Sequence, residues 1–278
     1  MPLSRAQLEA LAATPVQDPI PPRSLTPALT TRPFIPTRSL INIRDLGAVP
    51  GSAIRPGRIF RSGMLDAAAA HPDALAWLAS NVKTVFDLRS EEERAAFPSP
   101  RISRVKFVYY ERVADYPLSP DPADFAGDDD GSAAWRGQLL AVLAAYKPTI
   151  RAVLEHVRDS PGEPFLFHCT AGRDRTGVVA GLLQTLAGTK QADVILDYML
   201  SRIGIEPARE RLLMYFKASL GVEDLETPGF WNMASLRPAF WEAFVEGVEA
   251  EYGGWDGYVK TLGFSYKDLQ TIKKNLRA

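Results

Sequence analysis

One junction constrains the fold of this chain more than any other feature. An apolar run at residues 164–167 leads through a tight turn into an apolar helical pattern at residues 176–186, and the turn contains the only cysteine, Cys169. A strand, a short turn and a helix in this order point successive backbone N–H groups into one concavity at the helix N-terminus. Such a concavity binds anions, because its donors are unpaired and the helix dipole favours negative charge.

The turn also carries the residue types that an anion site needs. From His168 to Gly177 it reads HCTAGRDRTG. Gly172 allows the backbone to turn tightly and to approach a ligand, and Arg175 offers a planar fork for two phosphate oxygens. We therefore expect a phosphate-binding loop that consists of Thr170, Ala171, Gly172, Arg173, Asp174 and Arg175.

Cys169 lies at the floor of this expected loop. The donors that would bind phosphate also favour the thiolate form of a cysteine, and a thiolate that faces a phosphoryl group is placed for in-line attack. Arg175 and the loop amides would stabilise the charge that develops. The hydroxyl of Thr176 could stabilise the departing thiolate, and His168 is expected to fix the loop rather than act as a base. The alternative is a cysteine buried only for packing.

The loop resembles the Cys-x5-Arg phosphate loop of protein tyrosine phosphatases. More narrowly, it is similar to the tyrosine/serine and lipid phosphatase branch of bacteria and fungi, whose loop reads His-Cys-x-x-Gly-Lys-Asp-Arg-Thr. The resemblance covers about residues 40–276 and departs from the branch at Arg173, where lysine is usual. The chain also lacks the Trp-Pro-Asp sequence of ordinary tyrosine phosphatases. Five further stretches carry the likeness: NIRDLG at 42–47, RPGRIFRSG at 55–63, DLRS at 87–90 with Glu93, and the segments 251–253 and 258–263.

The resemblance implies a phosphomonoester hydrolase that acts through a phosphocysteine intermediate, without a cofactor. Phosphotyrosine and phosphoserine proteins would be its substrates, with phosphoinositides as a further class. Two alternatives remain open. One is a catalytically idle module that only recognises phosphoprotein or phospholipid, although such a module would not need the thiol. The other is a redox or sulfur-transfer enzyme with a related loop, which explains Cys169 but not the Arg175–Thr176 continuation.

Two carboxylates are candidates for the general acid that an alkoxide leaving group needs. Asp174 lies inside the loop and could protonate the leaving oxygen directly, so we favour it. Asp87 ends an expected strand that should lie beside the loop. It could donate the proton or order the loop arginines, or it could form a salt bridge with Arg89 or Arg44.

Several arginines outside the loop could add positive charge near the site. We expect Arg44 and Asp45 to form a structural pair and Arg61 to approach the loop. Together with Arg173, such arginines could accommodate a substrate with more than one phosphate. The set consists of Arg44, Arg55, Arg58, Arg61 and Arg89.

The pattern along the chain predicts an α/β fold. Runs of strand type at residues 82–88, 105–110 and 164–167 alternate with helical patterns, which favours a mostly parallel central sheet flanked by helices, as in tyrosine phosphatases. Residues 1–37 form a capped helix at 4–13 and a proline-rich arm, either wrapped on the domain or disordered, and residues 38–278 form one phosphatase domain. The helices after residue 186, including 207–220, either pack or form a lid over the pocket.

The segment 114–132 interrupts this order. It is rich in acids, prolines and glycines, and it predicts a solvated loop, one of whose acids could visit the site. These acids are Asp115, Asp121, Asp124, Asp128, Asp129 and Asp130.

The composition of the chain narrows its expected binding partners, cofactors and location. The net charge of −1 gives no global field that would recruit nucleic acid, and it allows at most transient contact with a membrane surface. One cysteine excludes an internal disulfide and favours a reducing compartment, and the three histidines lack ligand spacing, so we expect no metal. Residues 1–12 contain Arg5 and Glu9, unlike a secretory signal. We expect a soluble cytoplasmic protein of open oligomeric state.

Overall fold

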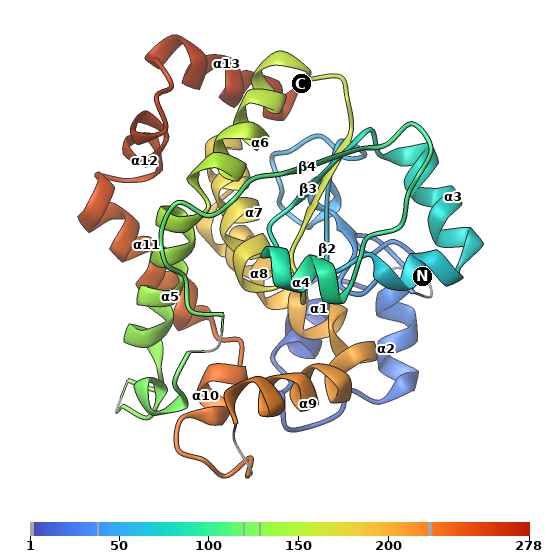
Figure 1. Ribbon diagram of the computed structural model, residues 1–278, viewed down its shortest axis with the longest axis vertical. Helices are drawn as coiled ribbons and strands as arrows, with labels where there is room; N and C mark the ends of the chain where they lie inside the picture. The colour runs from blue at the N-terminus through green and yellow to red at the C-terminus, as the bar shows by residue number, and fades with distance from the viewer. Residues whose placement is uncertain (1–2, 38, 119, 128, 222–223) are drawn as a thin grey trace.

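The centre of the protein is a five-stranded sheet of order β1-β2-β5-β3-β4 (Figure 1). The computed structural model describes residues 3–278 with the exception of 38, 119, 128 and 222–223. Neighbouring strands from β2 to β4 are parallel, and only β1 is antiparallel, to β2. The predicted α/β class with a mostly parallel sheet is therefore confirmed. The strands are β1 (Arg44–Asp45), β2 (Ile59–Ser62), β3 (Thr84–Asp87), β4 (Lys106–Tyr109) and β5 (Phe165–His168).

Alternate side chains of the strands enter two separate cores. Leu166 and Val85 pack with α3 (Pro72–Asn81) on one face of the sheet. Phe165 and Phe86 belong to the larger core on the other face, which contains α5 (Ser132–Ala145), α6 (Lys147–Asp159) and α7 (Asp174–Ala187). Figure 1 shows α3 on one side of the sheet and these three helices on the other. Burial on both faces explains why β5 reads as a continuous apolar run.

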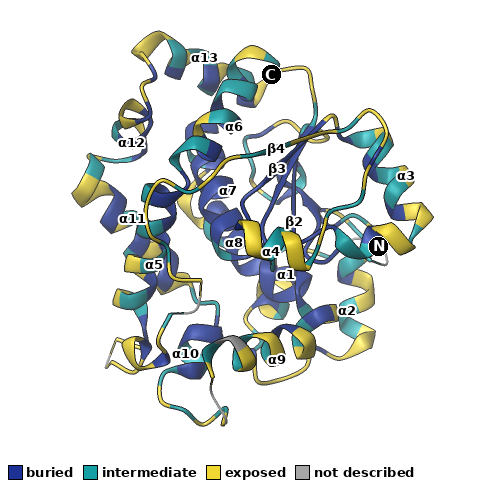
Figure 2. Ribbon diagram, in the orientation of Figure 1, coloured by how far each residue is buried: buried dark blue, intermediate teal, exposed yellow. Residues whose placement is uncertain are grey.

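Helix α7 is the central helix and begins at the end of the cysteine turn. It packs against α5, α8 and α13 and is almost entirely buried (Figure 2). Outer helices such as α3 show buried and exposed faces. The other helices are α1 (Arg5–Ala12), α2 (Pro22–Leu29), α4 (Glu91–Ala96), α8 (Gln191–Gly204), α9 (Arg209–Leu220), α10 (Phe230–Ala234), α11 (Pro238–Tyr252), α12 (Trp255–Thr261) and α13 (Tyr266–Arg277), with short 3-10 turns η1 (Leu46–Ala48), η2 (Asp66–Ala70), η3 (Pro122–Phe125) and η4 (Glu206–Ala208).

The sequence did not predict β2 as a strand, because Arg61 interrupts its apolar pattern. Arg61 is nevertheless fully buried in the sheet. A buried arginine is tolerated only where an acid and further acceptors compensate its charge. Its partners therefore decide whether this segment can be a strand, and they belong to distant parts of the chain.

The N-terminal arm packs against the domain. Helix α1 has the expected capping box of Ser4 with Gln7, and its Leu8 is 1% exposed in the main core. The buried Arg202 of α8 donates to the carbonyl oxygens of Thr14 and Asp18 at 2.9 and 2.7 Å. Of the two alternatives left open for this arm, these contacts favour the one wrapped on the domain, whereas α2 was not expected within it. The division at 37/38 stays a prediction, and position 38 lies outside the described residues.

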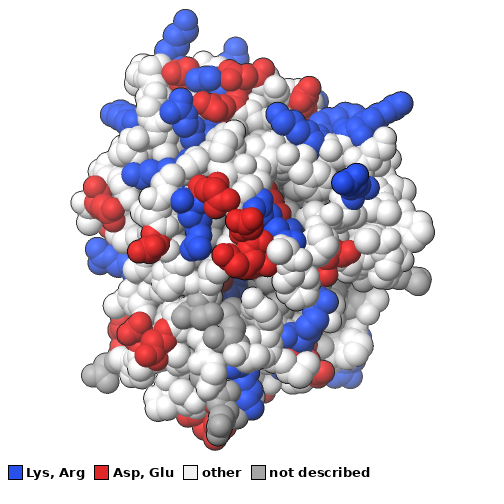
Figure 3. All heavy atoms as spheres, viewed as in Figure 1, with Lys and Arg blue, Asp and Glu red and all other residues white. Residues whose placement is uncertain are grey.

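Charges of both signs are distributed over the visible surface. Basic and acidic side chains are interspersed on the face in Figure 3, as a net charge of −1 would suggest. Among the helices of the described residues, none combines the length and the apolar composition needed to cross a membrane.

Candidate active site

The parallel strands bring their carboxyl ends to one edge of the sheet. His168, the last residue of β5, lies in register with Ser62 of β2 and with Asp87 of β3. Cys169 follows directly and is 3% exposed. The loop from Thr170 therefore emerges between two neighbouring strands, at the edge where open α/β sheets bind their ligands.

Side-chain donors hold the loop from behind by its carbonyl oxygens. Asn42 Nδ2 donates to the carbonyl oxygens of Ala171 and Gly172 at 3.1 and 2.8 Å. Arg61 Nη2 donates to those of Gly172 and Arg173 at 2.8 and 3.3 Å. Because successive carbonyls are bound on the outer side, the peptide N–H groups are turned toward the inside of the loop.

These inward N–H groups form an anion cradle. Within the described part of the chain, no backbone N–H from Thr170 to Arg175 donates to a protein acceptor. Gly172 has a φ of +67°, and an added Cβ there would lie 2.3 Å from the Ser62 carbonyl oxygen, so only glycine fits. Helix α7 begins at Asp174 and adds its N-terminal dipole. The loop thus presents a set of backbone donors that have no protein acceptor among the described residues.

A buried carboxylate supports the donors behind the loop. Asp197 of α8 accepts from Arg44 Nε at 2.8 Å and also from Arg61 Nη1. Burial alone would raise the pKa of Asp197, but the charges of the two arginines lower it below its usual value. The expected pair of Arg44 with Asp45 is wrong, since the Asp45 carboxylate accepts instead from the backbone N–H groups of Gly47 and Gly57 at 3.0 and 2.7 Å.

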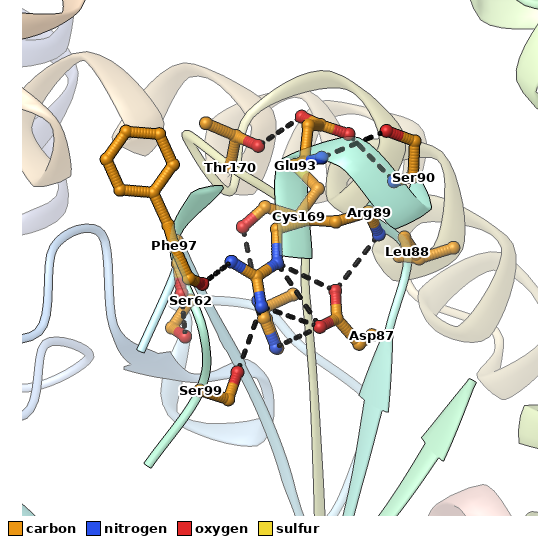
Figure 4. Close-up of polar contacts among 12 residues, drawn as sticks. Ser62, Asp87, Leu88, Arg89, Ser90, Glu93, Phe97, Ser99, Cys169 and Thr170 are labelled. Atoms are coloured by element: carbon orange, nitrogen blue, oxygen red, sulfur yellow. Dashed lines mark hydrogen bonds and ion pairs between the residues drawn. The ribbon is translucent and has the colours of Figure 1, made fainter. Parts of the chain in front are cut away.

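Glu93 binds the arginine of the loop. Its carboxylate accepts from Arg175 Nη1 and Nη2 at 2.6 and 2.7 Å, and from the Thr170 hydroxyl (Figure 4). Burial would raise the pKa of Glu93, but hydrogen bonds from Arg175 and Thr170 lower it to about 2. Arg175 Nη1 also donates to the Leu88 carbonyl oxygen at 3.1 Å. The guanidinium is therefore fixed beside Cys169 before any ligand binds.

Asp87 forms the salt bridge that was one of its predicted alternatives. Its carboxylate accepts from Arg89 Nε and Nη2 at 3.0 and 2.8 Å, as Figure 4 shows. Burial would raise the pKa of Asp87, but His168 and Arg89 lower it below its usual value. Asp87 is not among the residues that line the pocket above Cys169. The contacts of Asp87 are therefore those of a residue that stabilises the fold.

His168 and Thr176 lie behind the loop. His168 is fully buried, and its Nδ1 lies 3.2 Å from the Cys169 carbonyl oxygen. Burial lowers the pKa of His168 below its usual value, which favours the neutral ring. Thr176 is also fully buried, and its hydroxyl has no hydrogen-bond partner among the described residues. Neither residue lines the pocket.

A pocket opens above Cys169. Asp174 reaches it from the first residue of α7, with a carboxylate that is 17% exposed and 2.8 Å from Arg173 Nε. The floor of the pocket also contains Thr170 and Arg175. Its walls are largely apolar or aromatic and come from α5, α9, α10 and the segment before η3, with Tyr116, Leu118, Trp135, Leu212, Tyr215, Phe216 and Met233.

Two possibilities for additional charges in the pocket find no support among the described residues. None of the described acids of the segment 114–132 lines it, and Asp128 lies outside the described residues; this segment contributes Tyr116, Pro117, Leu118 and Pro120 instead. The arginines outside the loop also stay away from the lining. Arg44, Arg61 and Arg89 are buried in ion pairs with aspartates.

The sequence did not reveal which residues support the loop or line the walls of the pocket. Asn42 and Glu93 belonged to segments noted for their resemblance, but nothing assigned them a contact with the loop. Asp197 had a weak signal, because it is a charge on the buried side of an otherwise apolar helical pattern. Trp135 and Tyr116 had no signal, since an aromatic side chain in a core and one in a pocket wall look alike in a sequence.

Comparison with known proteins identifies the class that this fold and site define. Residues 35–278 match the model of a family described as the tyrosine phosphatase family. The chain belongs to this family and is a phosphatase that acts on phosphorylated substrates.

Individual relatives agree with the family assignment. A tyrosine-protein phosphatase of Nostoc commune is 30% identical over 213 residues, which cover 74% of this chain and 69% of the relative. The triple specificity protein phosphatase PtpB of Mycobacterium tuberculosis is 26% identical over 119 residues, which cover 40% of this chain and 43% of the relative.

Replacing Asp197 with asparagine should destabilise the protein by about 3–5 kcal/mol, because two buried guanidinium groups lose their counter-charge. Urea unfolding measures the free energy change, and phosphate release should fall together with it because Arg61 holds the loop. The matched control is Asp193→Asn on the same helix, whose partner Arg5 is 39% exposed, with an expected cost of at most about 1 kcal/mol. Equal effects of the two variants would contradict this role.

Glu93→Gln should lower stability in a pH-dependent way. The pKa of Glu93 in the fold, about 2, lies below its usual value of 4.5. Its ionised form therefore stabilises the fold fully above pH 4.5, and this stabilisation disappears as the pH falls through about 2. Urea unfolding should show a gap between wild type and variant near neutral pH that narrows in acid. Glu91→Gln, on the exposed side of α4, should show little change, and a gap independent of pH would count against the ion pair.

Proposed function

We propose that this phosphatase hydrolyses phosphotyrosine and phosphoserine in proteins through a phosphocysteine intermediate on Cys169. One observation carries the proposal. The unpaired N–H groups from Thr170 to Arg175 surround the position above the only cysteine, at the N-terminus of a buried helix. This arrangement stabilises both a thiolate and the oxygens of a phosphoryl group.

In the first step, the Cys169 thiolate attacks phosphorus and the bond to the leaving oxygen breaks. The loop amides and Arg175 bind the equatorial oxygens, whose charge grows during transfer. The Nε of Arg175 has no partner among the described residues, so it can donate to the phosphoryl group while Glu93 holds the two Nη atoms. Asp174, in its protonated form, gives a proton to the leaving oxygen.

In the second step, water attacks the phosphocysteine. Asp174, now a carboxylate, accepts a proton from this water, the sulfur–phosphorus bond breaks, and inorganic phosphate forms. The thiolate is regenerated, and the Thr176 hydroxyl, which is buried without a partner among the described residues, is available to stabilise it. Asp174 is proposed as the acid and base because it lines the pocket, whereas Asp87 does not.

The pocket walls support a phosphorylated side chain as substrate. Tyr116, Trp135 and Tyr215 offer aromatic surface to the ring of a phosphotyrosine. Phosphoinositides are a further class, but Arg44, Arg61 and Arg89 are engaged in buried ion pairs, and Arg55 and Arg58 do not line the pocket. We therefore expect no gain from additional phosphates on a lipid headgroup. A catalytic thiol requires a reducing environment, so we place the protein in the cytoplasm.

Cys169→Ser should abolish phosphate release, by at least about 10⁴-fold, because the hydroxyl is a far weaker nucleophile. The variant should still bind inorganic phosphate, which separates catalysis from recognition. The assay compares phosphotyrosine and phosphoserine peptides with mono- and bisphosphorylated inositol lipids. Activity of the variant equal to wild type would overturn the proposed role of Cys169. No activity in either protein with any substrate would overturn the proposed enzymatic function and favour an idle recognition module. Preference for the bisphosphorylated lipid would overturn the proposed substrate class.

Asp174→Asn should lower kcat for phosphoserine peptides by about 10²–10⁴-fold. It should also remove the decline of kcat at high pH, because this decline reports loss of the proton from the acid. Asp87→Asn is the matched variant, and it should keep this limb of the pH profile even if its stability drops. If Asp174→Asn retains full activity and an unchanged profile, another group is the acid.

A further inference from the structure

The side chain of Arg173 connects the loop to distant parts of the chain. It is 3% exposed, although both Arg173 and its neighbour Asp174 line the pocket. Its Nη1 donates to the carbonyl oxygen of Ala234 at 2.7 Å and its Nη2 to that of Met233 at 3.3 Å. Both acceptors lie in α10, so this side chain ties the loop to a helix about 60 residues further along the chain.

Aromatic rings cover the guanidinium. Its central carbon lies 4.9 Å from the centre of the Trp135 ring and 5.9 Å from that of Phe216. Aromatic faces stabilise a cation, most strongly where water is excluded. Burial would lower the pKa of Arg173, but the charge of Asp174 and its other contacts raise it above its usual value. Arg173 therefore stays charged and fixed without any ligand.

The Arg173 side chain also determines where Asp174 points. Its Nε donates to Asp174 Oδ1 at 2.8 Å, and within the described residues no other group hydrogen-bonds to this carboxylate. The other oxygen, Oδ2, remains available to the pocket. An acid at the first position of a helix, partly exposed, would otherwise sample several rotamers.

We infer that Arg173 is a positioning residue for Asp174: it holds Oδ1 so that Oδ2 presents the proton to the leaving oxygen. The inference rests on the proposed role of Asp174. It also means that Arg173 is not a binding group for a second phosphate, because such a ligand would have to break its contacts with Asp174 and α10. A lysine at this position could keep the charge but could not bind Asp174 and two carbonyls in the same plane.

The expected effect depends on the leaving group. A positioned acid matters most for a basic leaving oxygen and little for one that departs as a stable anion. We would measure kcat/KM, which reports the steps up to departure of the leaving group and not the later hydrolysis of the phosphocysteine, for a series of aryl phosphates of increasing leaving-group pKa, ending with an alkyl phosphate. Arg173→Met should lose about 10²-fold for the poorest leaving group, the size of effect that misplacement of a reacting group causes, and only about threefold for the best. Arg173→Lys should recover part of the loss.

A double-mutant cycle tests whether Arg173 acts through Asp174. In the Asp174→Asn background, Arg173→Met should cause no further leaving-group dependence. The inhibition constant of inorganic phosphate should change little, which would exclude a collapsed cradle. Arg237→Met is the matched control, because Arg237 stacks on Phe240 and donates to Asn232 of α10 but contacts none of the loop residues from Thr170 to Arg175 within the described structure. It should leave the series unchanged.

Three results would overturn the inference. The first is an equal loss for all leaving groups in Arg173→Met, which indicates a purely structural clamp. The second is an additive effect in the double variant. The third is an unchanged leaving-group series in Asp174→Asn, which would remove the role of Asp174 as acid; phosphate release that depends on Cys169 would then still stand. If Arg173→Met does not fold, Arg173→Lys decides, and a series identical to wild type would count against positioning.

Discussion

The carboxylate of Asp197 holds two buried arginines at the back of the loop that follows Cys169. Arg44 and Arg61 lie on neighbouring strands and would be costly to bury without this charge. Arg61 and Asn42 then bind the loop carbonyls, and Arg44 in turn contacts Asn42. The shape of the loop thus depends on an ion pair that never meets the substrate. A phosphate site with preset donors avoids reorganisation during the reaction.

The loop has two chemically distinct sides. Its carbonyl oxygens accept from side chains behind it, and its N–H groups face the position of the ligand without protein acceptors among the described residues. The same division extends to charged side chains. Glu93 binds the outer atoms of Arg175, and Arg173 binds one oxygen of Asp174, so each leaves the remaining atom of its partner directed to the pocket. The buried charged side chains are therefore hydrogen-bonded, while one atom of Arg175 and one of Asp174 stay available for the proposed reaction.

The walls of the pocket come from segments added around this loop. Helices α5, α9 and α10 and the chain at Tyr116 supply apolar and aromatic surface, and Arg173 connects the loop to α10 through two carbonyls. Such a wall suits a ring or an aliphatic chain and carries few polar groups of its own. A lid role for α9 stays one of the two alternatives that the sequence left open. The contacts of Arg173 make α10, by contrast, part of the loop's support.

The sequence by itself determined the local chemistry. A strand, a glycine-containing turn with Cys169 and Arg175, and a helix are properties of neighbouring residues, so periodicity and spacing revealed the loop and the α/β class. Only the tertiary structure decided which charges meet. Arg44 stands beside Asp45 in the sequence but pairs with Asp197 of α8. Arg61 pairs with the same distant aspartate, and the strand that contains Arg61 was not predicted because the sequence does not show this partner. A charge excluded from water takes whichever opposite charge the packed helices and strands bring to it, and the sequence does not record that distance.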